Sequence, residues 1–105
     1  PDAVLVIGIP DVSKFPFFAS GALTPVQLSA LSSDTVFANA ALQAAAADAG
    51  LKFAYTDLIA ASVNAPGQFS GAAAFSSDHF HYIDTGYSAI ESTALGAFIA
   101  FYPTF

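Results

Sequence analysis

The sequence predicts an α/β fold with parallel strands, and three observations support that prediction. A continuous apolar run, residues 3–9, is rich in β-branched side chains. An alanine-rich stretch with helical spacing follows it, and a second short apolar run occupies residues 51–55. A second stretch with helical spacing, residues 85–101, comes last. Strand and helix in alternation are typical of right-handed crossover connections between parallel strands.

The first strand is expected over residues 3–9, where every side chain except Gly8 is apolar. Such a run is typical of a strand that is buried on both faces of a parallel sheet. Pro10 ends it, because proline has no amide hydrogen to donate. Residues 14–20 then form a loop whose phenylalanines suit core packing or, alternatively, the lining of an acyl pocket.

Two helices are expected between the strands. Thr24 and Pro25 are an N-cap residue and a first helical residue, so a short helix is predicted over Val26–Leu31. Residues 33–34 then open a longer helix over about 35–49, with the next residue, a glycine, as its stop. The predicted sheet-facing side of this helix consists of Phe37, Ala40, Ala41, Ala44 and Ala47.

The second strand is expected over residues 51–55, and helical turns over 58–63. Asn64–Gly67 is predicted to be a turn and 68–76 a loop of small residues. The last helix is expected over 85–101, with the following proline, Pro103, as its end. Its apolar face is predicted to consist of Tyr87, Ile90, Ala94, Leu95, Phe98 and Phe101.

The chain has too few predicted strands to form the buried parallel sheet that residues 3–9 indicate. Two or three strands cannot bury the run at residues 3–9 on both faces and both edges, and an unpaired apolar edge promotes aggregation. We therefore expect additional strands from another segment or a partner. The chain begins at Pro1 almost directly in a strand, which suggests a processed product or a part of something longer.

Composition and charge exclude several classes of function. With 55% hydrophobic and 10% charged residues, the chain has too much apolar surface to stay disordered. Its apolar runs are too short and too interrupted to span a bilayer, so no transmembrane segment is expected, and no signal peptide is visible. The formal net charge of −6, with only Lys14 and Lys52 as cations, argues against a nucleic-acid partner and against anionic membranes.

The absence of cysteine excludes disulfides, zinc–thiolate sites and a cysteine nucleophile. The composition is acidic, poor in lysine and rich in serine, threonine and alanine, which suits an exported bacterial protein, secreted or in the cell envelope.

Both histidines of the chain lie in residues 77–87, before the last helix. Asp78 and His81 stand three residues apart, so one turn can bring the carboxylate to the imidazole. A carboxylate in this position fixes the tautomer of a histidine and stabilises the imidazolium. We therefore interpret Asp78 and His81 as the acid and base of a hydrolytic site whose nucleophile lies outside this chain.

Two other interpretations of this segment stay open. Asp78 could cap the following helix, with His81 as an ordinary surface residue. His79 and His81 could instead form an H-x-H metal pair, since both would face one side of a strand. Additional ligands would then have to come from Asp11, Asp57, Asp84 or Glu91.

Three polar residues elsewhere are also candidates. Asp11 and Asp57 each follow a predicted strand, at the carboxyl end where open α/β sheets bind ligands, although each also suits a helix cap. Asn39 lies within the alanine-rich helix, where asparagine is a poor helix former. We expect its side chain to hydrogen-bond a neighbouring loop.

Four segments, taken in order, resemble the C-terminal part of an SGNH (GDSL-type) esterase or lipase. Residues 78–87, DHFHYIDTGY, resemble the last motif of that family, D-G-x-H-P-x-x-x-G-Y. Residues 9–18 resemble the segment "iPDv…PfF" of bacterial members, and residues 37–42 resemble the following "N-x-x-L" helix. Residues 52–58 resemble the next strand with its aspartate. The similarity therefore covers most of the chain.

The resemblance implies a fold, an activity and a division of roles. The chain would be a single partial domain, residues 1–105, from a three-layer α/β/α sandwich of flavodoxin-like type. His81 would be the catalytic base and Asp78 the acid that orients it, with no metal or organic cofactor. The nucleophilic serine and part of the oxyanion hole belong to N-terminal motifs that this chain lacks, so the chain alone is expected to be inactive.

The expected partners are therefore an ester substrate, lipid or small acyl ester, and a companion polypeptide segment that carries the serine. Two positions depart from the family motif, because His79 replaces a small residue and Tyr82 replaces a proline. The alternative function is a non-catalytic structural or assembly module derived from the hydrolase fold.

Overall fold

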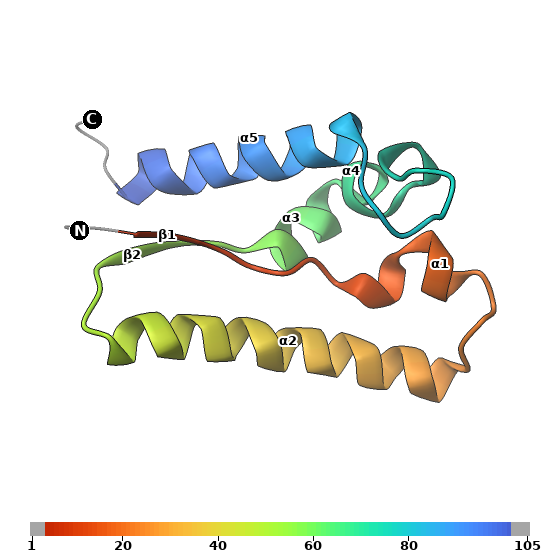
Figure 1. The fold of residues 1–105 in the computed structure, drawn as a ribbon, viewed down its shortest axis with the longest axis horizontal. Coiled ribbons are helices and arrows are strands. Elements are labelled where there is room, and N and C mark those ends of the chain that lie inside the picture. Colours follow the sequence, from red (N-terminus) through yellow and green to blue (C-terminus); the bar gives the residue numbers. More distant parts are fainter. Residues whose placement is uncertain (1–3, 102–105) are drawn as a thin grey trace.

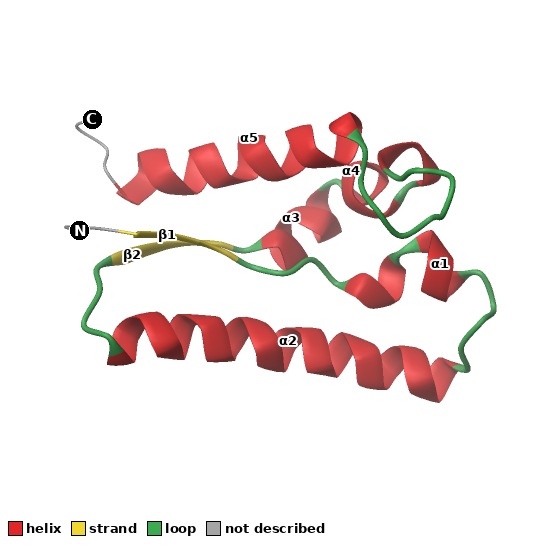
Figure 2. Cartoon of the chain, viewed as in Figure 1, coloured by secondary structure: helices red, strands yellow, loops and turns green. Residues whose placement is uncertain are grey.

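The computed structural model describes residues 4–101 and has a mixed α/β architecture with one parallel pair of strands. Figures 1 and 2 show the strands lying between the long helices α2 and α5. In chain order the elements are β1 (Val4–Ile7), the 3-10 helix η1 (Val12–Lys14), α1 (Pro16–Ala19), α2 (Pro25–Asp48), β2 (Phe53–Thr56), α3 (Leu58–Asn64), α4 (Pro66–Ser70), the 3-10 helix η2 (Ala72–Ala74) and α5 (Asp84–Phe101).

The two strands pair in parallel, as the alternation of elements predicts. Val4 lies opposite Phe53 and Ile7 opposite Thr56. The amide of Val4 donates to the carbonyl of Lys52 at 2.9 Å, and the amide of Gly8 extends the ladder by donating to Thr56 at 3.0 Å. The residues just after β1 and β2 therefore lie at the same edge of the sheet. Ala3, in the predicted strand, and Pro103, the predicted helix stop, lie outside the described residues.

The prediction that β1 is buried on both faces is wrong for this chain. Val4, Leu5 and Val6 are half-buried, and Ile7 is 46% exposed. In β2, by contrast, Ala54 and Thr56 are buried. A two-stranded sheet leaves one edge of each strand without a neighbouring strand. Water therefore reaches the side chains of β1 from that edge, and they are less buried than those of a central strand.

One continuous helix, α2, replaces the two helices expected between the strands. It begins as predicted, with a capping box: the amide of Gln27 donates to the Thr24 hydroxyl at 3.2 Å, and the amide of Thr24 donates to the Gln27 side chain at 2.9 Å. The predicted second start at Ser33 and Asp34 is wrong. Both residues are exposed inside α2, where neither glycine nor proline interrupts the chain.

The end of α2 is the predicted one. Gly50 has a φ of +72°, the left-handed conformation that glycine adopts without strain. Its amide donates to Ala47 at 2.9 Å, and the amide of Leu51 donates to Ala46 at 3.1 Å. These two bonds form a Schellman motif, which satisfies the last carbonyls of the helix.

The face of α2 that was expected to pack on the sheet points outward instead. Phe37 is 76% exposed, and the four alanines of the predicted face are exposed as well. The buried residues are Thr35, Asn39 and Ala46. Burying an alanine side chain removes little apolar surface from water, so it stabilises the fold only weakly. Hydrogen bonds to the segment after β1 therefore decide which face of α2 turns inward.

Asn39 makes the contact that was expected of it. Its Oδ1 accepts the amide of Ile9 at 2.6 Å, and its Nδ2 donates to the carbonyl of Ile9 at 2.8 Å. The buried Asn39 side chain thus hydrogen-bonds both the amide and the carbonyl of Ile9, which lies just beyond the end of β1. These two bonds fix α2 against the sheet.

Two segments predicted as loops contain short helices. Residues 14–20 include α1, and residues 64–76 include α4 and η2. Pro16 and Pro66 stand at the first positions of α1 and α4, where a missing amide hydrogen costs nothing. Prolines that looked like turn residues are therefore helix starters.

The last helix, α5, packs mainly against β2. Ile90 and Ala94 of its predicted apolar face lie inward, whereas Tyr87 and Leu95 are each 57% exposed. One core cluster joins α5 to α3 and α4 and consists of Leu58, Phe69 and Ala89, with Ala61 and Ile90 packed against it. Within residues 4–101, no helix combines the length and apolar character needed to cross a bilayer.

Candidate functional site

The loop between η2 and α5 forms a closed turn that carries the candidate residues. An antiparallel bridge between Phe75 and Tyr82 closes it, and the amide of Ser76 donates to the carbonyl of His81 at 2.8 Å. The amide of His79 donates back to the carbonyl of Ser76 at 3.0 Å. The geometry of the turn is thus fixed by its own backbone.

Both carboxylate oxygens of Asp78 are held within this turn. Oδ1 accepts the Ser76 hydroxyl at 2.6 Å and the amides of Phe80 and His81, each at 2.9 Å. Oδ2 faces the Nδ1 atom of His81 at 2.5 Å. Ser76 is not among the predicted site residues. Its signal in the sequence is its place two residues before an aspartate, where a hydroxyl can hydrogen-bond the carboxylate.

The imidazole of His81 is oriented by this carboxylate and otherwise open. An ionised carboxylate can only accept hydrogen bonds, so in the neutral imidazole Nδ1 carries the proton and Nε2 has the lone pair. No residue in the described part of the chain hydrogen-bonds Nε2, and the His81 side chain is 71% exposed. The pairing of Asp78 with His81 matches the expectation, and Asp78 does not cap α5, which begins six residues later at Asp84.

Hydrogen bonds keep Asp78 ionised. The Ser76 hydroxyl, the His81 side chain and the two amides hold the pKa of this carboxyl well below its ordinary value of 3.8. Asp78 is therefore negative at neutral pH, and it can stabilise a positive charge on His81.

The residue between them adopts an unusual backbone conformation. His79 has a φ of +61°, in the left-handed region that favours glycine. The family motif that this loop resembles has a small residue at this position. In this structure, the turn that brings Asp78 and His81 together places residue 79 at a positive φ.

Tyr82, the other departure from the motif, anchors the loop to the body of the protein. Its hydroxyl donates to the carbonyl of Phe69 in α4 at 2.7 Å, and its ring stacks on Phe75 with centroids 4.6 Å apart. Burial raises the pKa of this phenol to about 12, so it remains a donor. Gly86 makes room for the ring, because a Cβ there would collide with Tyr82 and lie 2.8 Å from the carbonyl of Ala74.

Aromatic residues near α1 support the other side of the loop. The amide of Phe17 donates to the carbonyl of His79 at 3.1 Å, and the ring of Phe80 lies edge-on to His81 with centroids 5.1 Å apart. Phe80 also packs edge-on against the rings of Phe15, Phe17 and Phe18. Phe15 is buried in a core cluster with Ala74 and Phe75, so core packing is the role that the structure gives it.

The two aspartates after the strands serve as caps. Asp57 Oδ1 accepts the amide of Ala60 at 2.9 Å at the start of α3. Asp11 accepts the amide and the hydroxyl of Ser13, at 3.1 and 2.5 Å, and the hydroxyl of Ser32 in α2 at 2.9 Å. Neither aspartate hydrogen-bonds the pair formed by Asp78 and His81.

The metal interpretation gains no support from the geometry. His79 and His81 lie in a turn, not in the strand that would align their side chains. Among the described residues, no three histidine, aspartate or glutamate side chains gather as metal ligands would.

The arrangement suits proton transfer at Nε2 of His81. An imidazole held by a carboxylate at Nδ1 can accept a proton at Nε2 from a nearby hydroxyl and return it later. Comparison with known proteins adds nothing to this geometry, since no family model, no curated protein and no solved structure matches the chain.

Proposed function

We propose that this chain is the C-terminal part of a serine ester hydrolase of the SGNH type and supplies the base His81 and the acid Asp78. The observation that carries the proposal is the 2.5 Å contact between Asp78 Oδ2 and His81 Nδ1, together with the open Nε2 atom. The proposal assigns two of the three triad roles to residues in one loop. The serine comes from a companion segment outside these 105 residues.

The reaction is acyl transfer in two steps. The serine oxygen attacks the ester carbonyl while His81 Nε2 takes its proton, and His81 then gives that proton to the leaving alcohol. Water repeats the sequence on the acyl-enzyme and releases a carboxylic acid. Asp78 stays ionised and stabilises the imidazolium that forms in each step.

The proposal extends to the fold of the completed protein. The pair β1 and β2 would be part of a larger parallel sheet in a three-layer α/β/α sandwich. The half-exposed apolar strand β1 supports this, because a run of Val, Leu, Val and Ile suits a strand with neighbours on both edges. The high exposure of His81 also suits a site whose other half is supplied by a companion segment.

The test is a comparison of two histidine variants in the assembled protein. His81→Ala should abolish hydrolysis of a short p-nitrophenyl ester, whereas His79→Ala, at the chain's other histidine, should retain most of it. Circular dichroism spectra should show that both variants keep the fold. Near wild-type turnover by His81→Ala would rule out the assignment.

A non-catalytic assembly module is the second candidate. The observation that favours it is the outward apolar face of α2, where Val36 is 55% and Phe37 is 76% exposed. Exposed apolar surface of this kind is typical of interaction sites. An assembled sample that carries no serine reactive toward a fluorophosphonate would favour the module over the enzyme.

A further inference from the structure

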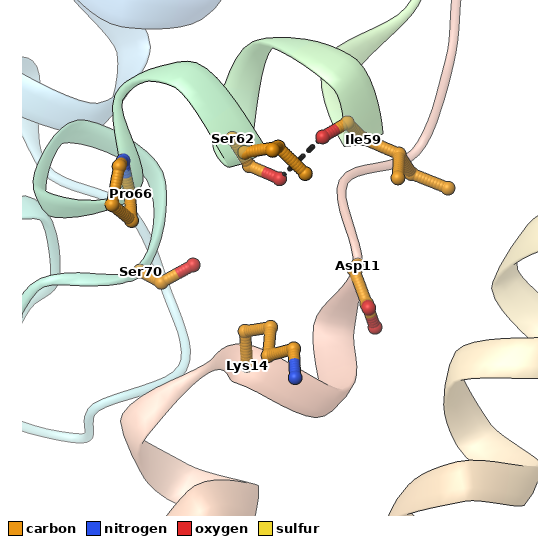
Figure 3. Close-up of a pocket in the computed structure, with 7 residues that line it drawn as sticks. Asp11, Lys14, Ile59, Ser62, Pro66 and Ser70 are labelled. Carbon is orange, nitrogen blue, oxygen red and sulfur yellow. Dashed lines mark hydrogen bonds between the residues drawn. The ribbon is translucent and has the colours of Figure 1, made fainter.

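A cavity of about 340 Å³ lies at the edge of the sheet where both strands end. Its walls come from η1 on one side and from α3 and α4 on the other (Figure 3). Open parallel sheets bind ligands at this edge, and the volume is in the range of small-molecule sites. None of the residues assigned to proton transfer lines it.

The walls of the cavity are largely apolar. Ile59 and Val63 of α3 and Pro66 of α4 present aliphatic surface to it, and Val63 is 75% exposed. An aliphatic chain of a few carbons would be removed from water against these side chains, which favours binding. The apolar part of a ligand therefore has a defined place.

Two of the polar groups that line the cavity can donate hydrogen bonds. Lys14 brings an ammonium group, and the hydroxyl of Ser70 points into the open space (Figure 3). Within residues 4–101 the single ion pair joins His81 to Asp78, so Lys14 forms no ion pair there.

The acidic residue that lines the cavity makes its hydrogen bonds elsewhere. Asp11 lines the cavity, but its carboxylate is turned toward α2, where it accepts the hydroxyl of Ser32 at 2.9 Å. Ser62 is also engaged, since it donates to the carbonyl of Ile59 at 2.7 Å. The free donors are thus Lys14 and Ser70, and a single ammonium matches a single negative charge.

We propose that this cavity binds a short aliphatic monocarboxylate, with the carboxylate on Lys14 and Ser70 and the alkyl chain on Ile59, Val63 and Pro66. A phosphate is a poorer match, because phosphate sites usually offer arginine or several converging donors, and the chain has no arginine. The identity of the ligand as the acid released by ester hydrolysis rests on the proposed function. The cavity shares α4 with the loop between η2 and α5 that carries Asp78 and His81, since the Tyr82 hydroxyl donates to the carbonyl of Phe69, the neighbour of Ser70.

The test is a titration of the full chain with butyrate, followed by amide chemical shifts at constant ionic strength. Butyrate should shift residues of η1, α3 and α4 with a dissociation constant of roughly millimolar order, as expected for so small a ligand. Neutral butyramide should bind at least about fivefold more weakly, because it lacks the charge that pairs with Lys14.

Matched variants complete the experiment. Lys14→Gln should weaken butyrate binding by about fivefold or more, and Ser70→Ala by a smaller factor, while Lys52→Gln, at the chain's other lysine, should leave it unchanged. Equal binding of butyrate and butyramide, equal effects of the two lysine variants, or a preference for methyl phosphate over butyrate would each overturn the proposal. The titration needs no turnover, so its failure is distinct from loss of the proposed esterase activity.

Discussion

At the scale of single residues, the account depends on Asp78 and His81. Their contact is local, since three residues separate them, and the turn that holds them is closed by its own backbone hydrogen bonds. A local pair of this kind can form before any companion segment binds. The role of each residue can also be tested by a single substitution.

The first residue-scale prediction concerns Asp78. If the proposed hydrolase is assembled, Asp78→Asn should lower its kcat by about a thousandfold or more, because an amide at this position no longer fixes the tautomer or stabilises the imidazolium. Asp84→Asn, six residues further on, is the matched control and should have little effect. Steady-state kinetics with a p-nitrophenyl ester would measure both, and equal rates for the two variants would contradict the assigned role.

The second prediction follows from the lowered pKa of Asp78. Its folded-state pKa lies below the ordinary value of 3.8, so its hydrogen bonds stabilise the fold fully above that value. This contribution should be lost as the pH falls from about 4 toward the lower folded-state pKa. Urea denaturation at several pH values should show a stability gap between wild type and Asp78→Asn at pH 6 that shrinks at acidic pH. A gap independent of pH would be inconsistent with the shift.

The third prediction concerns His79. Its φ of +61° is strained for a residue with a Cβ, so His79→Gly should stabilise the fold by about 0.5–1 kcal/mol despite the greater freedom of glycine when unfolded. Chemical denaturation would measure the change. Gly21→Ala is a useful comparison, since Gly21 has a φ of +102° and the opposite, destabilising effect is expected there. Destabilisation by His79→Gly would mean that the histidine side chain makes a favourable contact.

At the scale of elements, α2 is positioned by polar contacts more than by its alanines. The side chain of Asn39 pairs both backbone groups of Ile9, and Ser32 bonds Asp11. These contacts explain why the alanine face predicted from spacing points outward. Helical periodicity identifies a face of like residues but not what the face contacts.

The fourth prediction tests this role of Asn39. Asn39→Ala should destabilise the fold by about 2–3 kcal/mol, because two hydrogen bonds are lost and the backbone of Ile9 is left unpaired. Gln43→Ala, one turn further along α2, removes only a 3.5 Å contact and should cost far less. Thermal or urea denaturation would compare them, and equal costs would show that Asn39 does not fix the helix.

Much of the secondary structure is predictable from the sequence, and the errors have physical causes. Both strands, the Thr24 cap, the Gly50 stop and α5 are local features with strong signals. Ser33 and Asp34 misled the prediction, because cap residues also tolerate solvated positions inside a helix. Pro66 did so as well, because proline starts a helix as readily as it forms a turn.

The candidate site was predictable in part. The spacing of Asp78 and His81 indicated their contact, but the roles of Tyr82 and Phe80 depend on packing against α4 and α1. Such contacts between distant segments leave no pattern in a single sequence. The caps formed by Asp11 and Asp57 were one of two options that the sequence left open.

At the scale of the whole molecule, three features of this chain support the proposed assembly with a companion segment. An apolar strand lies half-exposed, large apolar side chains cover the outer face of α2, and the imidazole of His81 has an open Nε2 atom. A companion segment that adds strands beside β1 and a serine beside His81 would account for the strand and the imidazole together.

The most direct test of the central claim is labelling of the native purified assembly with a fluorophosphonate, followed by mass spectrometry of the labelled peptide. The account predicts one labelled serine on a companion segment, with labelling abolished by His81→Ala and retained by His79→Ala. Absence of labelling in an assembly that contains that segment, or labelling unaffected by His81→Ala, would contradict the account.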